Sequence, residues 1–276
     1  MAPQPKEATR SFKSMPLHGL LKQRIAQKGF ENATPIQDKT LEALINGRNL
    51  MGIANTGTGK TGAFLIPIIH ELLNSKHKFQ TLILVPTREL ALQVEEEFKS
   101  LTKGLKLYSI CLIGGTNIQR DMAKLRRHHH LIIGTPGRTL DLMKRKALSV
   151  RNCEKLVLDE FDRMLDMGFV NDVRRIKDSM YKRQQTVLFS ATESKKQRPI
   201  VDEFLDRPTV VRVASGQSTG KNIEQSIVRL NEGDNKFQQL LDVLREANNA
   251  KVILFEETKR KVSRLCLLYT SDAADD

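Results

Sequence analysis

A glycine-rich segment carries the strongest chemical signal in the chain. It reads NLMGIANTGTGKTGAF, an apolar run followed by a turn and a helical pattern, and it is close to the phosphate-loop pattern G-x-x-x-x-G-K-[ST]. Gly57 and Gly59 allow the backbone to direct N–H groups at phosphate oxygens. Lys60 supplies a positive charge for the β- and γ-phosphates, and Thr61 offers a hydroxyl to Mg²⁺. The segment therefore predicts a nucleotide-phosphate site at the start of a helix.

A second signal is the cluster of acids in KLVLDEFDRMLDMGF, where Asp159 and Glu160 directly follow an apolar run. One interpretation is that the acids cap the helix DRMLDMGFVNDVRRI, because carboxylates favour a helix N-terminus. The other is that Asp159 holds Mg²⁺ and Glu160 positions an attacking water, since ligands bind at the carboxyl ends of parallel strands. The phosphate loop favours the second interpretation, because hydrolysis needs both charge neutralisation and an oriented nucleophile.

The composition is that of an ordinary globular protein with a basic surplus. Of the 276 residues, 39% are hydrophobic and 28% charged, and the net charge of +13 is compatible with a polyanionic partner. No apolar run reaches the ~18 residues of a membrane helix, and the N-terminal segment lacks the apolar core of a signal peptide. Three widely spaced cysteines, Cys111, Cys153 and Cys266, match no disulfide or zinc pattern. We therefore expect a cytoplasmic protein without membrane association.

The cluster KLRRHHH, Lys124 to His130, has two interpretations. It could bind a metal, but three consecutive histidines cannot all face one ion in regular structure, and no second cluster adds ligands. We interpret it as an exposed basic face that precedes a strand.

Seven short apolar runs alternate with longer helical patterns. Amphipathic stretches such as ELALQVEEEFKSLTK separate several of the runs. This alternation predicts an α/β fold in which a parallel sheet is flanked by helices and the carboxyl ends of the strands share one edge. The predicted strands are NLMGIA, TLILV, LYSICLIG, LIIGT, KLVLDE, TVLFSA and TVVRV.

The polar segment SGQSTGKN, residues 215–222, predicts a linker between a domain of residues 1–214 and a second unit of residues 223–265. In the second unit, EQSIVRL and AKVILFEE are predicted strands around the helix NKFQQLLDVLREA. Two strands are too few for an independently stable sheet. Residues 266–276, CLLYTSDAADD, interrupt the helical pattern of TKRKVSRL and resemble a translated sequencing adaptor, so we expect a non-native tail.

With the phosphate loop and the acids, further segments resemble the motifs of the DEAD-box ATP-dependent RNA helicases. The resemblance extends from Phe12 to about Leu265 and implies a complete RecA-like P-loop domain followed by the beginning of a second RecA-like lobe. GFENATPIQ resembles the Q motif, which reads adenine, and ANTGTGKT matches motif I. A glutamine amide can pair with N6 and N7 of adenine. The implied ATP-binding residues are Phe12, which packs on the base, Thr34, Gln37, Ala54, Asn55, Thr56, Gly57, Thr58, Gly59, Lys60 and Thr61.

Three more segments, PTREL, a GG pair and TPGR, resemble family elements that hold the sugar-phosphate backbone of single-stranded or locally duplex RNA. Arginine forks, hydroxyls and backbone amides suit that task. Without the family, PTREL and TPGR are ordinary turn and helix-cap signals. The implied RNA-binding residues are Pro86, Thr87, Arg88, Gly114, Gly115, Thr135, Pro136, Gly137 and Arg138.

The remaining motifs imply catalysis and its coupling to closure of the lobes. SAT matches motif III, so the implied coupling residues are Asp162, Ser190, Ala191 and Thr192. The implied catalytic residues are Lys60, Asp159 and Glu160, the metal ligands are Thr61 and Asp159, and the cofactors are ATP and Mg²⁺. The family usually has alanine where this chain has Phe161. Because side chains alternate along a strand, we expect the larger ring to fill space under the following helix.

The resemblance implies an ATP-dependent RNA helicase that is present as a fragment. VILFEETKRKVSRL resembles the start of motif IV, and the later arginines that complete the ATP site have no counterpart, so we expect the 276-residue chain to be nearly inactive. The alternative is a non-catalytic nucleotide- and RNA-binding module. Glu160 favours the enzyme, because a binding module has no need of a water-positioning carboxylate. Gln37 argues against a third possibility, another kind of P-loop ATPase.

Overall fold

The structure of this chain is a computed structural model that describes residues 9–75, 80–193, 197–213, 226–230, 233, 235–246 and 251–272, with side chains up to Cys266. The chain divides into two compact units, Met1–Gln217 and Ser218–Asp276, and each is described by itself. The predicted linker, residues 215–222, lies outside the described residues.

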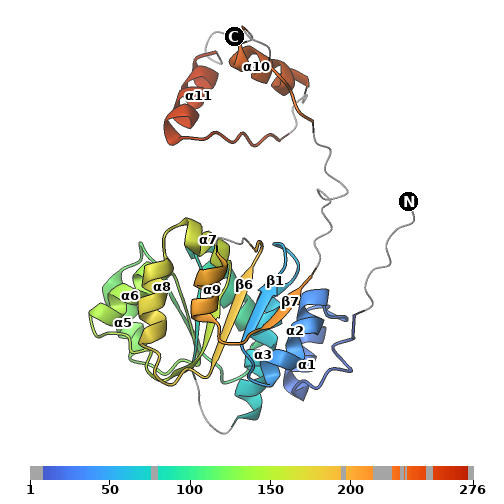
Figure 1. Ribbon diagram of the computed structural model, residues 1–276, viewed down its shortest axis with the longest axis vertical. Helices are drawn as coiled ribbons and strands as arrows, with labels where there is room; N and C mark the ends of the chain where they lie inside the picture. The colour runs from blue at the N-terminus through green and yellow to red at the C-terminus, as the bar shows by residue number, and fades with distance from the viewer. Residues whose placement is uncertain are drawn as a thin grey trace. The chain divides into compact units, whose positions relative to one another are not determined.

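The first unit is built on a seven-stranded sheet with the strand order β3-β4-β2-β5-β6-β1-β7 (Figure 1). Every pairing in this sheet is parallel. This confirms the predicted α/β fold, and each predicted apolar run of this unit forms a strand. The strands are β1 (Leu50–Ile53), β2 (Gln80–Leu84), β3 (Ser109–Leu112), β4 (Leu131–Gly134), β5 (Cys153–Leu158), β6 (Gln185–Ser190) and β7 (Thr209–Arg212).

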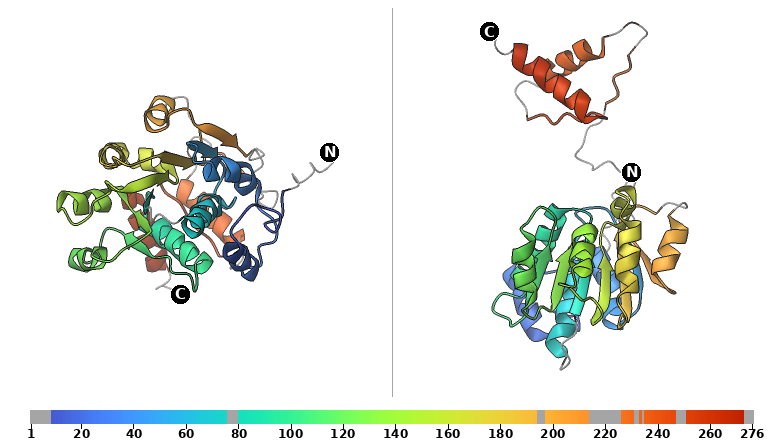
Figure 2. Two further views of the ribbon diagram at one scale, coloured as in Figure 1. Left: turned by 90° about the horizontal axis from the view of Figure 1, so that it is seen from below. Right: turned by 90° about the vertical axis from the view of Figure 1, so that its left-hand side faces the viewer.

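Helices cover both faces of the sheet, because the central strands are apolar on both sides (Figure 2). In β5, Val157 packs into one hydrophobic core, whereas Leu156 and Leu158 pack into the other. Helices α1 (Gly19–Gln27), α2 (Pro35–Ile45), α3 (Lys60–Asn74) and α4 (Arg88–Leu101) contribute to the first core. Helices α5 (Ile118–Leu125), α6 (Pro136–Lys144), α7 (Phe161–Asp166), α8 (Val170–Asp178) and α9 (Arg198–Phe204) contribute to the second.

The prediction of one helix over DRMLDMGFVNDVRRI is wrong. Helix α7 ends at Asp166 and α8 begins at Val170. Gly168 between them has a φ of 77°, a left-handed conformation that ends a helix and that glycine adopts without steric cost. The break turns the chain back over the second core, where Met164 and Val173 are both fully buried.

The second unit contains α10 (Lys236–Glu246) and α11 (Lys259–Asp272). The predicted strands EQSIVRL and AKVILFEE are wrong for the residues that can be assessed, since residues 226–230 and 251–256 form no strand. A strand needs a neighbour for its backbone hydrogen bonds, and the described part of this unit supplies none. Apolar side chains such as Ile253 and Phe255 are therefore exposed, at 79% and 88%.

The prediction that the last residues interrupt the final helix is also wrong, because α11 continues to Asp272. The segment from Cys266 to Asp272 contains neither glycine nor proline, so it offers no strong helix breaker. The non-native origin of residues 266–276 stays a prediction. Among the described residues, no helix has the length and apolar character needed to cross a bilayer.

Candidate functional site

The motif-like segments of the first unit meet at the edge of the sheet where the parallel strands end. The PTREL, GG and TPGR segments follow β2, β3 and β4, and these strands are neighbours in the order β3-β4-β2. The phosphate loop, the acids and SAT follow or end β1, β5 and β6, which are neighbours in the order β5-β6-β1. The edge is thus divided into two halves. One half holds the residues predicted to bind RNA, and the other holds the residues predicted to bind and hydrolyse the nucleotide. The halves meet between β2 and β5.

The phosphate loop has the backbone geometry of an anion-binding turn. Gly57 and Gly59 have φ values of 80° and 90°, and α3 begins at Lys60. Asn55 and Thr56 are exposed. Lys60 is 6% exposed, and its Nζ donates to the Ala54 carbonyl at 2.8 Å. The loop therefore brings a helix N-terminus and the charge of Lys60 together at the start of α3, which suits the binding of a polyphosphate.

Gln37 lies against the phosphate loop. Its Oε1 accepts a hydrogen bond from the Thr34 backbone N–H at 2.9 Å, and its Nε2 donates to the Gly59 carbonyl at 3.0 Å. A Cβ at Gly59 would lie 2.7 Å from this Nε2, and one at Gly62 would lie 2.6 Å from it. The amide predicted to read adenine thus connects the start of α2 to the phosphate loop, and its role in adenine recognition stays a prediction.

Phe12 occupies the core beside these elements and is only 4% exposed. Its backbone N–H donates to the Glu31 carbonyl at 3.0 Å, which ties the segment to the loop before α2. The described contacts of its ring are therefore core contacts, and its stacking on a base stays a prediction.

The two adjacent acids are buried side by side at the end of β5. Asp159 is 4% exposed and Glu160 5%. The pKa of Asp159 is raised to about 6, chiefly by burial. The positive charge of Lys60 opposes this rise, and the neighbouring Glu160 carboxylate contributes to it. Neither side chain forms the predicted cap, because α7 has no side-chain cap hydrogen bond. A buried carboxylate with a raised pKa is one that a bound cation would stabilise.

Glu160 is held by a residue that the sequence analysis did not identify. Its Oε2 accepts from Arg163 Nη1 at 2.7 Å, and its backbone adopts a left-handed conformation with a φ of 52°. The signal was the spacing of three positions on a helix, which brings side chains together. Arg163 is half exposed, at 55%, so this ion pair orients the carboxylate more than it stabilises the fold.

The SAT segment is joined to the acids by Asp162. Asp162 Oδ2 accepts hydrogen bonds from the Ala191 N–H at 3.2 Å, the Thr192 N–H at 3.1 Å and the Thr192 hydroxyl at 3.0 Å. The Ser190 hydroxyl donates to the Thr192 carbonyl at 2.7 Å. These contacts bring the four predicted coupling residues together, although their role in coupling stays a prediction.

Phe161 points away from this polar edge, as the alternation predicts. It is 1% exposed and belongs to the second core. Its ring meets Phe204 of α9 edge-on, with ring centroids 5.4 Å apart and ring planes at 67°. The larger residue therefore fills space between α7 and α9, on the side away from the buried acids.

In the other half of the edge, Arg88 lies over the GG pair. A Cβ at Gly115 would sit 2.2 Å from Arg88 Nη1, and the φ of Gly115 is 76°. Only glycine allows this approach of a guanidinium to the loop. Thr87 caps α4, its hydroxyl accepting from the Leu90 N–H at 3.3 Å. This confirms the ordinary cap interpretation of PTREL, whereas contact of this segment with RNA stays a prediction. Arg88 itself is exposed.

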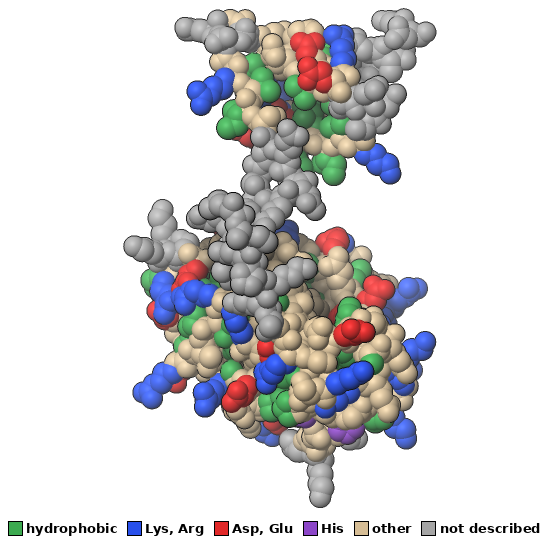
Figure 3. All heavy atoms as spheres, turned by 90° about the vertical axis from the view of Figure 1, so that its right-hand side faces the viewer, with side chains coloured by type: hydrophobic (Ala, Val, Ile, Leu, Met, Phe, Trp, Pro, Cys, Tyr) green, Lys and Arg blue, Asp and Glu red, His purple; other side chains and the backbone are tan. Residues whose placement is uncertain are grey.

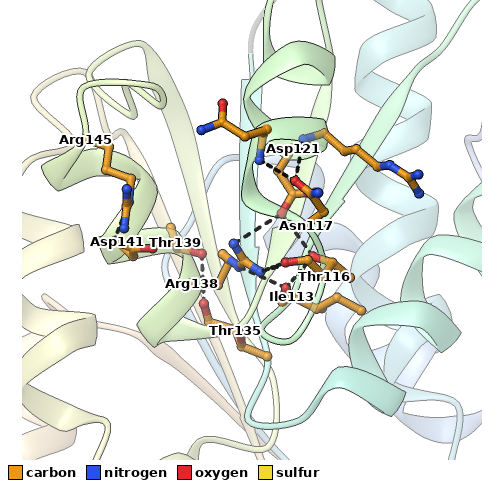
Figure 4. A network of polar contacts seen from close by, with 11 residues as sticks. Ile113, Thr116, Asn117, Asp121, Thr135, Arg138, Thr139, Asp141 and Arg145 are labelled. Atoms are coloured by element: carbon orange, nitrogen blue, oxygen red, sulfur yellow. Dashed lines mark hydrogen bonds and ion pairs between the residues drawn. The ribbon is translucent and has the colours of Figure 1, made fainter.

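Arg138 has its donors occupied by the loop after β3 (Figure 4). Nε donates to the Ile113 carbonyl at 3.0 Å, and Nη2 donates to the Thr116 carbonyl at 2.5 Å. Asp121 Oδ2 lies 3.7 Å from Nη1, and the Arg138 side chain is 9% exposed. Thr116 and Asp121 were not identified from sequence, because nothing in TPGR indicates which loop its arginine contacts. Arg138 holds the GG loop in place, and its contact with RNA stays a prediction.

The basic cluster before β4 is only partly exposed. Arg126, Arg127 and His128 are exposed. His130 is 6% exposed and its Nδ1 accepts from the Tyr108 N–H at 3.1 Å, which differs from the exposed face that we expected. The last histidine is turned inward because it directly precedes the buried strand β4.

A glycine-rich phosphate loop and buried strand-end acids on a parallel sheet define a RecA-like P-loop protein. A family model described as DEAD/DEAH box helicase matches residues 34–200. The chain belongs to the DEAD/DEAH box helicase family.

The relatives that this chain resembles are longer proteins. The DEAD-box ATP-dependent RNA helicase CshA of Bacillus cereus is 38% identical over 255 residues, which cover 92% of this chain and 48% of that protein. The ATP-dependent RNA helicase CshA of Listeria monocytogenes is 40% identical over 241 residues, which cover 87% of this chain and 46% of that protein. The chain therefore spans about half the length of these curated relatives.

Two solved structures show the same fold. A DEAD box protein from the hyperthermophile Methanococcus jannaschii is 32% identical, with a TM-score of 0.69 over 95% of this chain and 70% of that one. A hypothetical ATP-dependent RNA helicase from Sulfolobus tokodaii is 31% identical, with a TM-score of 0.66 over 71% of this chain and 57% of that one.

Proposed function

We propose that this chain is the ATP-binding and RNA-binding part of an ATP-dependent RNA helicase. The observation that carries the proposal is the division of one sheet edge into a phosphate-loop half on β5, β6 and β1 and a half with exposed donors on β3, β4 and β2. The names of the relatives, which describe ATP-dependent RNA helicases, support the same function.

In the nucleotide half, the backbone N–H groups of the loop around Gly57 and Gly59 bind the phosphates, and Lys60 adds its charge. Gln37 contacts the base and keeps its bond to the loop, so that adenine and the phosphates are recognised by connected groups. Glu160 orients the attacking water, with its carboxylate held by Arg163.

Mg²⁺ fits the residues present. Thr61 and Asp159 offer oxygen donors, and Asp159 is a buried carboxylate whose pKa is raised by burial. Mg²⁺ takes one or two protein carboxylates together with substrate phosphates, so it requires no dense cluster of protein ligands. When bound, the ion neutralises charge on the phosphates as the terminal bond breaks.

In the other half, Arg88 supplies a charged fork to the phosphates of the RNA, while Thr87, Gly114, Gly115 and Thr135 offer hydroxyl or amide donors. Such contacts bind the sugar-phosphate backbone without reading sequence. A cytoplasmic location stays a prediction.

Titration of the chain with ATP and GTP in the presence of Mg²⁺ tests the nucleotide half. We expect ATP to bind more tightly than GTP, and Lys60→Ala to weaken both. Lys182→Ala removes an exposed lysine before β6, at the opposite edge of the sheet, and serves as the control. Equal affinities for ATP and GTP would contradict adenine recognition.

Turnover separates the enzyme from a non-catalytic binding module. In a longer protein with a complete second lobe, RNA-stimulated phosphate release should be lost in Glu160→Gln while nucleotide binding remains. A protein that binds ATP and RNA but releases no phosphate under any condition would favour the binding module.

A further inference from the structure

A groove of about 580 Å³ runs beside β3, the outermost strand of the sheet. Helix α4 forms one wall through Leu92 and Lys99, and α5 forms the other through Arg120 and Lys124. Cys111 of β3 lies on its floor. The groove is separate from the phosphate loop and from the acids.

The groove carries a local excess of uncommitted positive charge. Its carboxylates are already engaged: Glu95 pairs with Lys99 at 2.8 Å, and Asp121 accepts from the Thr116 hydroxyl at 3.1 Å. Asp121 also lies within ion-pair distance of Arg138. In the described part of the chain, the exposed side chains of three lining residues form no hydrogen bond or ion pair; these are Arg120, Lys124 and Arg127.

These three cations follow a single line. Arg120 and Lys124 are separated by one helical turn of α5, about 6 Å along its axis, and Arg127 lies two residues beyond the end of the helix at Leu125. On the face seen in Figure 3, Lys and Arg side chains of the first unit are interspersed with Asp and Glu. A row of cations without partners is therefore more than the general basic character of the chain.

One end of the groove opens at the candidate RNA site. Thr116 and Asn117 line that end, and they belong to the loop that carries the GG pair and that Arg138 holds (Figure 4). The other end is lined by Arg127 and His129, just before β4. An RNA strand bound at the GG loop would thus meet a continuous row of positively charged side chains along the side of the sheet.

We propose that this groove extends the RNA-binding surface, with Arg120, Lys124 and Arg127 contacting phosphates of nucleotides beyond those held at the GG loop. The inference rests on the proposed RNA-binding function. Cations spaced along a path bind a polyanion without reading its sequence. Continuity with the GG loop favours RNA over an acidic peptide as the occupant.

Two fluorescent oligouridylates test the proposal with the 276-residue chain. The short one spans only the GG loop and its neighbours, and the long one also reaches the groove. Three phosphate contacts in the groove should make the log–log salt dependence of the long RNA steeper than that of the short one by about 2, at ~0.7 per phosphate. In the triple variant Arg120→Gln, Lys124→Gln, Arg127→Gln, the two slopes should become equal.

The matched control is Lys144→Gln, Lys146→Gln, Lys182→Gln, which removes the same charge from exposed positions away from the groove. It should keep the difference between the long and short RNA. Thermal unfolding of both variants checks that they fold.

Each other outcome overturns a specific statement. If the wild-type chain fails to bind even the short RNA, the proposed function fails. If it binds both RNAs with the same slope, or if the two triple variants behave alike, the groove proposal alone fails. Tight binding of a polyglutamate peptide that is lost only in the groove variant, without an effect on RNA, would assign the groove to an acidic protein partner instead.

Discussion

The carboxylate of Asp162 accepts both the backbone N–H and the hydroxyl of Thr192 through one oxygen, at 3.1 and 3.0 Å. Asp162 follows β5 and Thr192 follows β6, so the pair joins the ends of two adjacent strands. Any movement of the SAT segment therefore acts on the helix that begins beside the acids.

Removing this connection should destabilise the first unit. Asp162 is 7% exposed, and hydrogen bonds to a buried charged group each contribute roughly 1.5–3 kcal/mol. We expect Thr192→Val, which removes one of these bonds, to lower the free energy of unfolding by about 1.5 kcal/mol, and Asp162→Ala, which removes three, to lower it by more than about 3 kcal/mol, both measured by urea denaturation. Thr192→Ser keeps the hydroxyl and should stay close to wild type. A stable Asp162→Ala variant would show that these bonds contribute little.

Asp159 should make the stability of the ligand-free chain depend on pH. Because burial raises its pKa from 3.8 to about 6, the folded state holds this proton more tightly than the unfolded state. Its contribution is therefore present at low pH and is lost as the pH rises from about 4 to about 6. The two pKa values correspond to a loss of roughly 3 kcal/mol.

The control for this pH dependence is Asp159→Asn, which cannot titrate. Its denaturation midpoint should fall less over the same pH range than that of wild type. The pKa of Glu71 is also raised by burial, and the comparison removes that shared contribution. Identical pH profiles for wild type and Asp159→Asn would contradict the raised pKa.

Gln37 should affect the nucleotide site in two ways, because it donates to the Gly59 carbonyl and is also proposed to contact the base. We expect Gln37→Ala to weaken ATP binding by about tenfold, equivalent to roughly 1.4 kcal/mol, and GTP binding by less. Gln37→Glu keeps the acceptor for the Thr34 N–H but lacks the donor to Gly59. Calorimetric titration of both nucleotides measures the change, and an unchanged ratio of ATP to GTP affinity would exclude base recognition.

Arg88 and Arg138 should differ although both belong to predicted RNA motifs. Arg88 is exposed, so Arg88→Gln should reduce the salt dependence of RNA binding by about 0.7 and leave stability unchanged. Arg138 holds Ile113 and Thr116, so Arg138→Gln should lower the thermal unfolding temperature and weaken RNA binding at all salt concentrations. A stable Arg138→Gln variant with only a flatter salt slope would instead place Arg138 directly on RNA.

The strands and their common edge could be predicted from sequence because each strand is a compact apolar run. The strand order could not, since it depends on which crossovers return next to which strand. The break at Gly168 was missed because the helical periodicity continues across it. The hydrogen-bond partners of Arg138 were missed for a different reason: Ile113 and Thr116 lie more than twenty residues earlier in the chain.

The predicted strands of the second unit were wrong because the sequence pattern of a strand was present but the neighbouring strand was not, in the described part of this unit. Val252, Ile253 and Leu254 have the composition of a buried strand, but composition alone does not make one when the described chain offers no neighbour to pair with. In the site, residue types were predictable from the motifs. The ion pair of Arg163 with Glu160 has a spacing of three positions, but this spacing alone did not identify it because α7 begins only at Phe161.

One half of the sheet edge is built by a single continuous stretch of sequence, whereas the other half is built by two. Strands β2, β3 and β4 are consecutive in sequence, and they lie between β1 on one side and β5 and β6 on the other. The chain enters this block at Gln80, where β2 begins, and returns to the nucleotide half at Cys153, where β5 begins. These two residues are direct partners in the register of β2 and β5. The half that carries the candidate RNA residues is thus one continuous chain segment, and the points where the chain enters and leaves it are adjacent in the sheet. Its length or loops can change without altering the path of the chain through the nucleotide half.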